Sequence, residues 1–280
     1  MRVPAALAYP RWFSTFCAPG EDRRAVLIDT LRGLSIPHER IGIGPFQHIQ
    51  VRGGREFKPQ PGETILLAHY DRVPSSPGAN DNGASVLALV EYVLRAARPL
   101  RVIFTDGEEL PPGTGASQQG AYALARSWGP VARLFPVVLD MTGIGDTLVL
   151  GHLGEHLVRL SRGESLPTEL DAYAKVRWKA KRWLAGCGAG DTVEVNTPFS
   201  DDLGLFLAGI PSAQVSVLPR KQALAYRSIR QSPAEVAGGE AGTLPPAWQP
   251  MHSSEDRPET LWAASQALIL GALEKLEQFS

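Results

Sequence analysis

Three short apolar runs in this sequence each end in histidine or acidic side chains. The runs, with the side chains that close or follow them, are 64–69 with His69 and Asp71, 101–105 with Glu108 and Glu109, and 136–139 with Asp140. Short apolar runs of this kind, bounded by turns, are typical of buried strands in a parallel sheet. Ligands bind beyond the carboxyl ends of such strands, so we expect these side chains to meet at one edge of one sheet. Their charges need compensation, which indicates a pair of divalent metal ions.

Asp81 and His252 lie where loops lead into predicted helices. Asp81 stands directly before apolar residues at helical spacing, and His252 precedes a helix in which Pro258 suits the first position. An aspartate at such a point is often a helix N-cap. Held rigidly at the rim of the sheet, it is also able to bridge two cations. A histidine in a loop at a helix entrance is able to close a metal site from the other side.

Each of these residues also has an ordinary structural explanation. A histidine at a strand end is commonly a hydrogen-bonded core residue, adjacent glutamates commonly form a surface pair, and an aspartate after a strand commonly lies in a turn. The spacing of His69 and Asp71 places both side chains on one side of the chain, where the carboxylate would orient the histidine ring. Because several such side chains are expected at the same edge, we favour a metal site over separate structural roles.

The remaining pattern predicts the elements that position these residues. Helices are predicted at 21–33, 79–98, 117–128, 153–184, 201–208 and 258–279, and strands at 46–51, 64–69, 101–105, 136–139, 147–151 and 210–218. Together they predict an α/β fold of one domain over residues 1–280, with a central mixed, largely parallel β-sheet and helices on both faces. Residues 219–250 are predicted to form a long loop, in which Tyr226 and Trp248 either line the substrate pocket or cover the core.

Composition and charge narrow the classes of partner. The chain has 280 residues and a formal net charge of −1, so no overall field favours nucleic acid or an anionic membrane. No apolar run approaches the ~20 residues of a membrane span, and the N-terminus is a poor signal peptide. Cys17 and Cys187 are predicted to be free thiols, which favours a reducing, cytoplasmic location. Basic residues between 175 and 182 are interpreted as a solvated helix face, with an acidic partner as the alternative.

Taken in order and spacing, these motifs resemble a known group of enzymes over residues 10–278. The matching segments are His69-Tyr-Asp71, Pro77-Gly-Ala-Asn-Asp81-Asn-Gly, Asp106-Gly-Glu108-Glu109, Leu139-Asp140-Met, Ser200-Asp201 and His252-Ser-Ser-Glu-Asp256. The chain is similar to the two-zinc aminopeptidases related to aminopeptidase Y and the bacterial leucyl aminopeptidases. Glutaminyl cyclases and the transferrin-receptor ectodomain are relatives of that group. The resemblance implies the zinc-exopeptidase fold.

The resemblance also implies a role for each matching residue. It assigns His69 and Asp140 to one zinc ion, Glu109 and His252 to the other, Asp81 to both, and Glu108 to the general base. In that assignment a water between the two ions attacks the N-terminal peptide bond of a peptide with a free N-terminus. Asp71 supports the catalytic site, Ser200 and Asp201 are candidates for binding substrate, and a cis peptide bond is expected between Asp81 and Asn82. The family often has histidine where this chain has Asp202, which alters the local hydrogen bonding.

Other functions of the same fold remain open at this point. A glutaminyl-cyclase-like acyltransferase is one, although those relatives use a single zinc and this chain keeps the ligands for two ions. A carboxypeptidase or dipeptidase with a similar site is another. A non-catalytic binding module, as in the receptor ectodomains, is the alternative from a different class, although those ectodomains lack parts of the ligand set that this chain retains.

Overall fold

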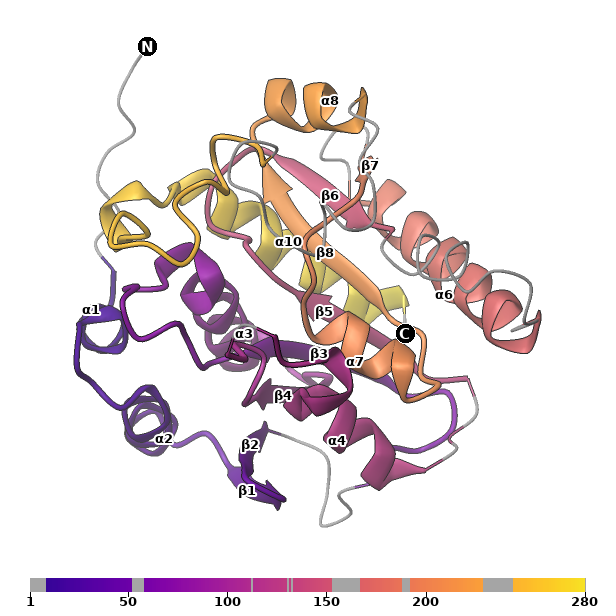
Figure 1. The fold of residues 1–280 in the computed structure, drawn as a ribbon, viewed down its shortest axis with the longest axis horizontal. Coiled ribbons are helices and arrows are strands. Elements are labelled where there is room, and N and C mark those ends of the chain that lie inside the picture. The colour runs from indigo at the N-terminus through magenta and orange to yellow at the C-terminus, as the bar shows by residue number, and fades with distance from the viewer. Residues whose placement is uncertain are drawn as a thin grey trace.

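The structure is a computed structural model in which an eight-stranded mixed sheet forms the centre (Figure 1). It describes residues 9–51, 58–111, 113–129, 131, 133–152, 167–187, 192–228 and 244–279. The strands are β1 (His38–Ile43), β2 (Phe46–Val51), β3 (Thr64–His69), β4 (Arg101–Thr105), β5 (Phe135–Leu139), β6 (Thr147–Gly151), β7 (Val193–Val195) and β8 (Ala213–Leu218). Their order across the sheet is β1-β2-β4-β3-β5-β8-β6-β7.

The middle of the sheet is parallel and fully buried. β3 pairs in parallel with β4 and with β5, and β5 pairs in parallel with β8. Every residue of these four strands is buried, as expected for strands covered on both faces. The flanking pairs β1–β2, β2–β4 and β6–β8 are antiparallel. The prediction of a mixed, largely parallel sheet is therefore confirmed, and the carboxyl ends of β3, β4 and β5 meet at one edge.

Helices cover both faces of the sheet, as predicted. Along β3, Ile65 and Leu67 pack in the cluster that includes α4 and α7, whereas Leu66 and Ala68 pack in the cluster that includes α3 and α10. Figure 1 shows α10 passing behind β8 and α7 in front of the sheet. The helices are α1 (Arg11–Cys17), α2 (Arg23–Gly33), α3 (Ala84–Arg95), α4 (Gly120–Trp128), α6 (Pro167–Ala185), α7 (Asp201–Leu207), α8 (Arg220–Ser228) and α10 (Ala263–Phe279), with short turns at Ala79–Gly83, Ala116–Gln118 and Pro258–Thr260.

The predicted loop at 219–250 begins with a helix, α8. Within its described part, the Tyr226 and Trp248 side chains are 3% and 0% exposed, and their ring centroids lie 5.6 Å apart in a buried cluster. The hypothesis that they line the substrate pocket is therefore wrong, and the alternative, that they cover the core, is correct. The first part of the helix predicted at 153–184 lies outside the described residues, and α6 accounts for the rest.

Two expectations drawn from the composition concern the cysteines and membrane-spanning helices. Both cysteines are free, with Cys17 buried and Cys187 partly exposed. Among the described residues, none of the helices combines the length and the apolar composition that crossing a membrane requires.

Candidate metal centre

His69 is the last residue of β3, and the carboxylate of Asp71 faces the Nδ1 side of its ring. The His69 side chain is fully buried, and its Nδ1 lies 3.6 Å from Oδ1 of Asp71. The other oxygen of Asp71 accepts a hydrogen bond from the backbone N–H of Glu109, with 2.9 Å between the heavy atoms. Asp71 therefore faces the His69 ring and holds the backbone of the loop after β4 by a hydrogen bond. Such a carboxylate orients a metal-binding histidine and selects its tautomer.

Asp81 faces two imidazole rings with its two carboxylate oxygens. It lies in the helical turn Ala79–Gly83, and the peptide bond from Asp81 to Asn82 is cis, as expected. Its Oδ1 lies 3.3 Å from Nε2 of His69, and its Oδ2 lies 3.3 Å from Nε2 of His252. The Asn82 side chain anchors the turn by donating to the Leu139 carbonyl at 2.8 Å. A carboxylate placed in this way is able to bridge two ions.

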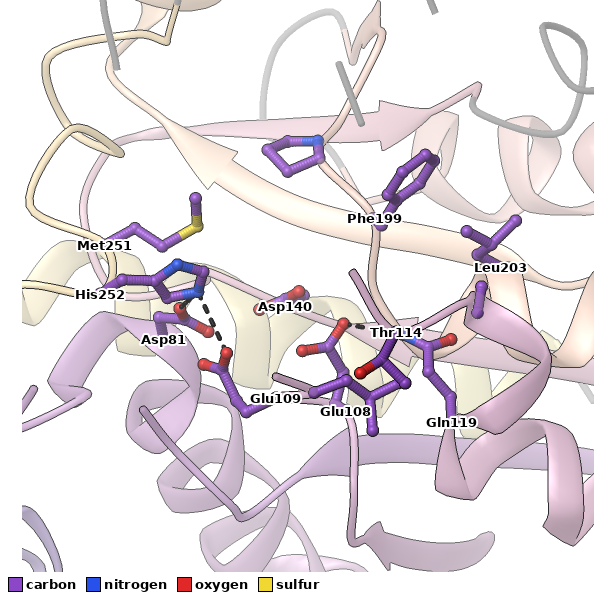
Figure 2. A pocket seen from close by; sticks show the side chains of 13 residues that line it. Asp81, Glu108, Glu109, Thr114, Gln119, Asp140, Phe199, Leu203, Met251 and His252 are labelled. Atoms are coloured by element: carbon purple, nitrogen blue, oxygen red, sulfur yellow. Dashed lines mark hydrogen bonds and ion pairs between the residues drawn. The ribbon is translucent and has the colours of Figure 1, made fainter. Parts of the chain in front are cut away.

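Each imidazole also faces one further carboxylate. His69 Nε2 lies 3.7 Å from Oδ1 of Asp140, and His252 Nε2 lies 3.1 Å from Oε2 of Glu109. Figure 2 shows Asp81, Glu109 and Asp140 around the same space, below His252. The side chains thus form three sets with metal-ligand spacing, of which one is His69, Glu108 and Glu109 and the other two share Asp81. These two sets are His69, Asp81 and Asp140, and Asp81, Glu109 and His252.

The chemistry of these groups fits divalent ions. His69 Nε2, Asp81 Oδ2 and Asp140 Oδ1 are buried and have no hydrogen-bond partner among the described residues. Burial raises the pKa of Glu109 to about 7, and the nearby Asp81 carboxylate adds to this increase. Contact with the Asp81 and Glu109 carboxylates raises the pKa of His252 to about 11. Buried carboxylates that resist ionisation and unpaired imidazole nitrogens are what a pair of ions with nitrogen and oxygen ligands would satisfy.

Glu108 projects into the same space and is held by an amide. Gln119, which directly precedes α4, donates from Nε2 to Oε1 of Glu108 at 3.1 Å. Burial raises the pKa of Glu108 well above its usual value, with a further contribution from the charge of Glu109. Sequence reasoning did not identify Gln119, because nothing in its neighbourhood shows that its side chain turns toward Glu108.

A cavity of about 440 Å³ opens beside these residues. One side carries Asp81, Glu108, Glu109, Asp140 and His252. Figure 2 shows Phe199 and Leu203 across the space from these carboxylates. Both belong to the apolar residues that also line the cavity. These apolar residues are Leu110, Ala116, Pro198, Phe199, Leu203 and Met251.

Ser200 and Asp201 lie behind the apolar wall of this cavity. Both side chains are fully buried, and neither lines the cavity, whereas Phe199 and Leu203 on either side of them do. Asp201 accepts a hydrogen bond from the Thr105 hydroxyl at the end of β4. Burial raises the pKa of Asp201 to about 7.

Arg23 supports the loop that leads to Asp81. It belongs to α2, its side chain is buried, and its guanidinium donates hydrogen bonds to the Phe16 carbonyl (3.2 Å) and to four further backbone carbonyls. These belong to Tyr70 (3.3 Å), Asp71 (3.2 Å), Pro77 (2.6 Å) and Gly78 (2.5 Å). In the sequence Arg23 looks like any charged residue of a surface helix, so its role was missed.

Comparison with models of known protein families shows to which family this chain belongs. Residues 52–261 match the model of peptidase family M28, which is three quarters of the chain. The chain belongs to peptidase family M28. The groups of histidine and carboxylate side chains described above have the spacing of metal ligands. No curated protein matches its sequence.

Several proteins with solved structures have the same fold as this member of family M28. BSAP, a zinc aminopeptidase from Bacillus subtilis, is 23% identical, with a TM-score of 0.53 over 83% of this chain and 50% of BSAP. LapA aminopeptidase of Legionella pneumophila is 14% identical, with a TM-score of 0.55 over 95% and 66%. A glutaminyl cyclase from an Acidobacteriales bacterium is 20% identical, with a TM-score of 0.56 over 100% and 98%. The chain thus spans about half the length of BSAP.

Proposed function

We propose that this chain is a two-metal aminopeptidase that hydrolyses the N-terminal peptide bond of peptides. The observation that carries the proposal is the position of Asp81, whose two oxygens face the rings of His69 and His252 at 3.3 Å each. His69 and Asp140 would hold one ion, Glu109 and His252 the other, and Asp81 both. Zinc suits this set of nitrogen and oxygen ligands.

Glu108 is the proposed general base, supported by Gln119. When bound, two ions would polarise the scissile carbonyl and lower the pKa of a metal-bound water. Glu108 then takes a proton from that water and passes it to the leaving amine. Gln119 holds one carboxylate oxygen of Glu108 and leaves the other directed into the cavity. Asp71 keeps His69 and the backbone of Glu109 in register while this happens.

The charge of the centre favours a substrate with a free N-terminus. Five carboxylates surround it, those of Asp71, Asp81, Glu108, Glu109 and Asp140. Two divalent ions carry four positive charges, so one negative charge remains to attract an α-ammonium group. The cavity of about 440 Å³ lies toward the small end of ligand pockets, which suits a chain end. Ser200 and Asp201 would shape its apolar wall from behind.

Metal analysis combined with a panel of aminoacyl chromogenic substrates tests the proposal. We expect about two ions per chain at saturation, loss of turnover on chelation, and cleavage of aminoacyl substrates with a free amine. N-acetylated versions of the same substrates are the matched controls and should resist cleavage. Cleavage of the blocked substrates would instead support a carboxypeptidase or another peptidase specificity, and a chain that binds no divalent metal would support a binding module.

Glutaminyl cyclisation is the second candidate, favoured by one observation. The Acidobacteriales glutaminyl cyclase has nearly the same length as this chain, since the match covers 98% of it. The retained set of five metal-ligand candidates argues for hydrolysis, because it provides for two ions. A saturating content of one ion per chain, together with cyclisation of a peptide that begins with glutamine, would favour the cyclase.

The proposal also extends to the domain organisation, location and partners of the chain. We infer that residues 1–280 act as one catalytic domain. A single sheet positions His69, Glu109 and Asp140. Asp81 in its helical turn and His252 in its loop lie against these residues. A cytoplasmic location and peptides as partners, without nucleic acid or membrane, are part of the proposal. Fractionation of the native host and a peptide-binding assay would test them.

A further inference from the structure

A larger cavity lies at the opposite edge of the sheet from the metal centre. Its volume is about 790 Å³. Gly62, Phe135 and Pro211 line it, at the amino ends of β3, β5 and β8. The residues of the metal centre follow the carboxyl ends of β3, β4 and β5. The sheet therefore separates the two cavities, and the second one has no part in the proposed peptidase chemistry.

The floor of the second cavity is apolar and its rim is cationic. Phe135, Val176 and Ile210 are buried side chains of the floor. Arg133, Lys175 and Lys179 also line the cavity, whereas Asp171 is the one acidic residue that the described part of the chain contributes to the lining. A volume of this size lies within the range of small-molecule pockets. The lining thus combines room for an apolar body with an excess of positive charge.

Four of the five basic residues of α6 form two pairs, and the fifth, Arg182, lies over the Trp178 ring, 4.7 Å from its centroid. Arg177 and Lys181 both form ion pairs with Glu194, and Lys181 Nζ lies 2.9 Å from its carboxylate. Lys175 and Lys179 point to the cavity side instead, because they lie one turn apart on the helix. Among the residues that the structure describes, neither of these lysines, nor Arg133, has a carboxylate within 4.0 Å. The interpretation of the whole basic run as a solvated face therefore holds for only part of it.

Lys179 is the cation placed deepest against the apolar floor. Its Nζ lies 4.4 Å from the centroid of the Phe135 ring. Partial burial lowers the pKa of Lys179, and no acidic side chain of the described residues offsets this. A half-buried ammonium group that contacts an aromatic ring but no carboxylate is incompletely compensated, and an anion bound beside it would stabilise its charge.

We propose that this cavity binds a small monocarboxylate with an apolar tail. The tail occupies the floor formed by Phe135, Val176 and Ile210, and the carboxylate lies between Lys179 and the other two cations of the rim. A neighbouring cavity of about 500 Å³ shares Val131, Gly209 and Ile210 with the proposed binding cavity. It extends the apolar space available to the tail of the ligand.

Calorimetric titration with octanoate tests the proposal, with 1-octanol as the matched uncharged ligand. We expect octanoate to bind with one site per chain and at least tenfold more tightly than octanol. Lys179→Met should weaken octanoate binding at least tenfold, which corresponds to about 1.4 kcal/mol, and should leave octanol binding unchanged. Lys181→Met removes a positive charge from the same helix outside the cavity and is the control, expected to bind like the wild type. Ala172→Phe, on the lining, should weaken both ligands by filling the cavity.

Several outcomes would overturn the proposal. These are no saturable octanoate binding, equal affinity for octanoate and octanol, or the same loss in Lys181→Met as in Lys179→Met. Octanoate binding that persists in Lys179→Met and disappears when metal is removed would also overturn it, because the carboxylate would then lie at the metal centre. Melting temperatures of all variants establish that each is folded before titration.

Discussion

The carboxylate of Asp256 accepts a hydrogen bond from the backbone N–H of Asp81, with 3.0 Å between Oδ2 and N, across 175 residues of sequence. Its other oxygen accepts from the backbone N–H of Asn80 at 2.7 Å, and its main-chain oxygen accepts from Ala79 at 3.1 Å. One residue therefore satisfies three consecutive N–H groups that a helix start leaves unpaired. Because His252 belongs to the same loop, Asp256 joins two proposed ligands of the metal centre.

Asp256→Asn should weaken metal binding about 10- to 100-fold, the range typical of residues that support metal ligands. The amide group would place an N–H donor opposite one of the backbone donors, so the turn that carries Asp81 would shift. Competition with a chelator on the folded protein measures the affinity. Glu255→Gln is the matched control, since the Glu255 side chain is 68% exposed and its carboxylate contacts Arg257. Equal affinities in the two variants would show that Asp256 does not position Asp81.

Glu108→Gln should retain the metal content and lose turnover by about 10²–10⁴-fold, because an amide cannot accept the proton of the attacking water. The amide has nearly the shape of the carboxylate, so the cavity should keep its form. Metal analysis and kcat measured on one preparation separate the two effects. A variant with near-normal kcat would exclude Glu108 as the base.

Gln119→Leu should lower kcat about tenfold and change KM little. Hydrogen bonds to charged groups contribute about 1.5–3 kcal/mol, and this variant removes the one that Gln119 donates to Glu108. Gln118→Leu is the control, since Gln118 is the exposed neighbour. A fall in kcat without a change in metal content or melting temperature indicates positioning. If both variants lose kcat equally, the hydrogen bond has no such role.

The ends of the strands made much of the metal centre predictable. His69, Glu109 and Asp140 follow buried parallel strands, and adjacent parallel strands bring their ends together without further information. Arg23 and Gln119 could not be found in this way, because their contacts depend on how α2 and α4 dock. β1 was missed as well, since only two of its residues, Ile41 and Ile43, are strongly apolar and none of the strand is buried. Tyr226 and Trp248 were misplaced because an aromatic residue in a Pro- and Gly-rich segment looks the same whether it packs inward or faces a ligand.

Gly120→Ala should destabilise the protein, whereas Gly271→Ala should not. A Cβ at Gly120 would lie 1.7 Å from the backbone oxygen of Asp106, next to the loop that carries Glu108. Overpacking of this kind costs about 1–3 kcal/mol or more. A Cβ at Gly271 in α10 meets no atom within 4 Å, and alanine should add about 0.8–1 kcal/mol through its helix propensity. Urea unfolding of both variants measures the difference. Similar midpoints would contradict the close approach at Gly120.

The two imidazoles of the centre differ in their access to water. The His252 side chain is 48% exposed, whereas that of His69 is fully buried. In the proposed two-ion centre, a chelating agent would therefore reach the ion beside His252 first and remove the two ions in two kinetic phases. Metal-free protein given one equivalent of a spectroscopically visible metal would reveal whether the position beside His69 or the position beside His252 has the greater affinity. At equilibrium this result does not depend on how quickly each position exchanges its ion.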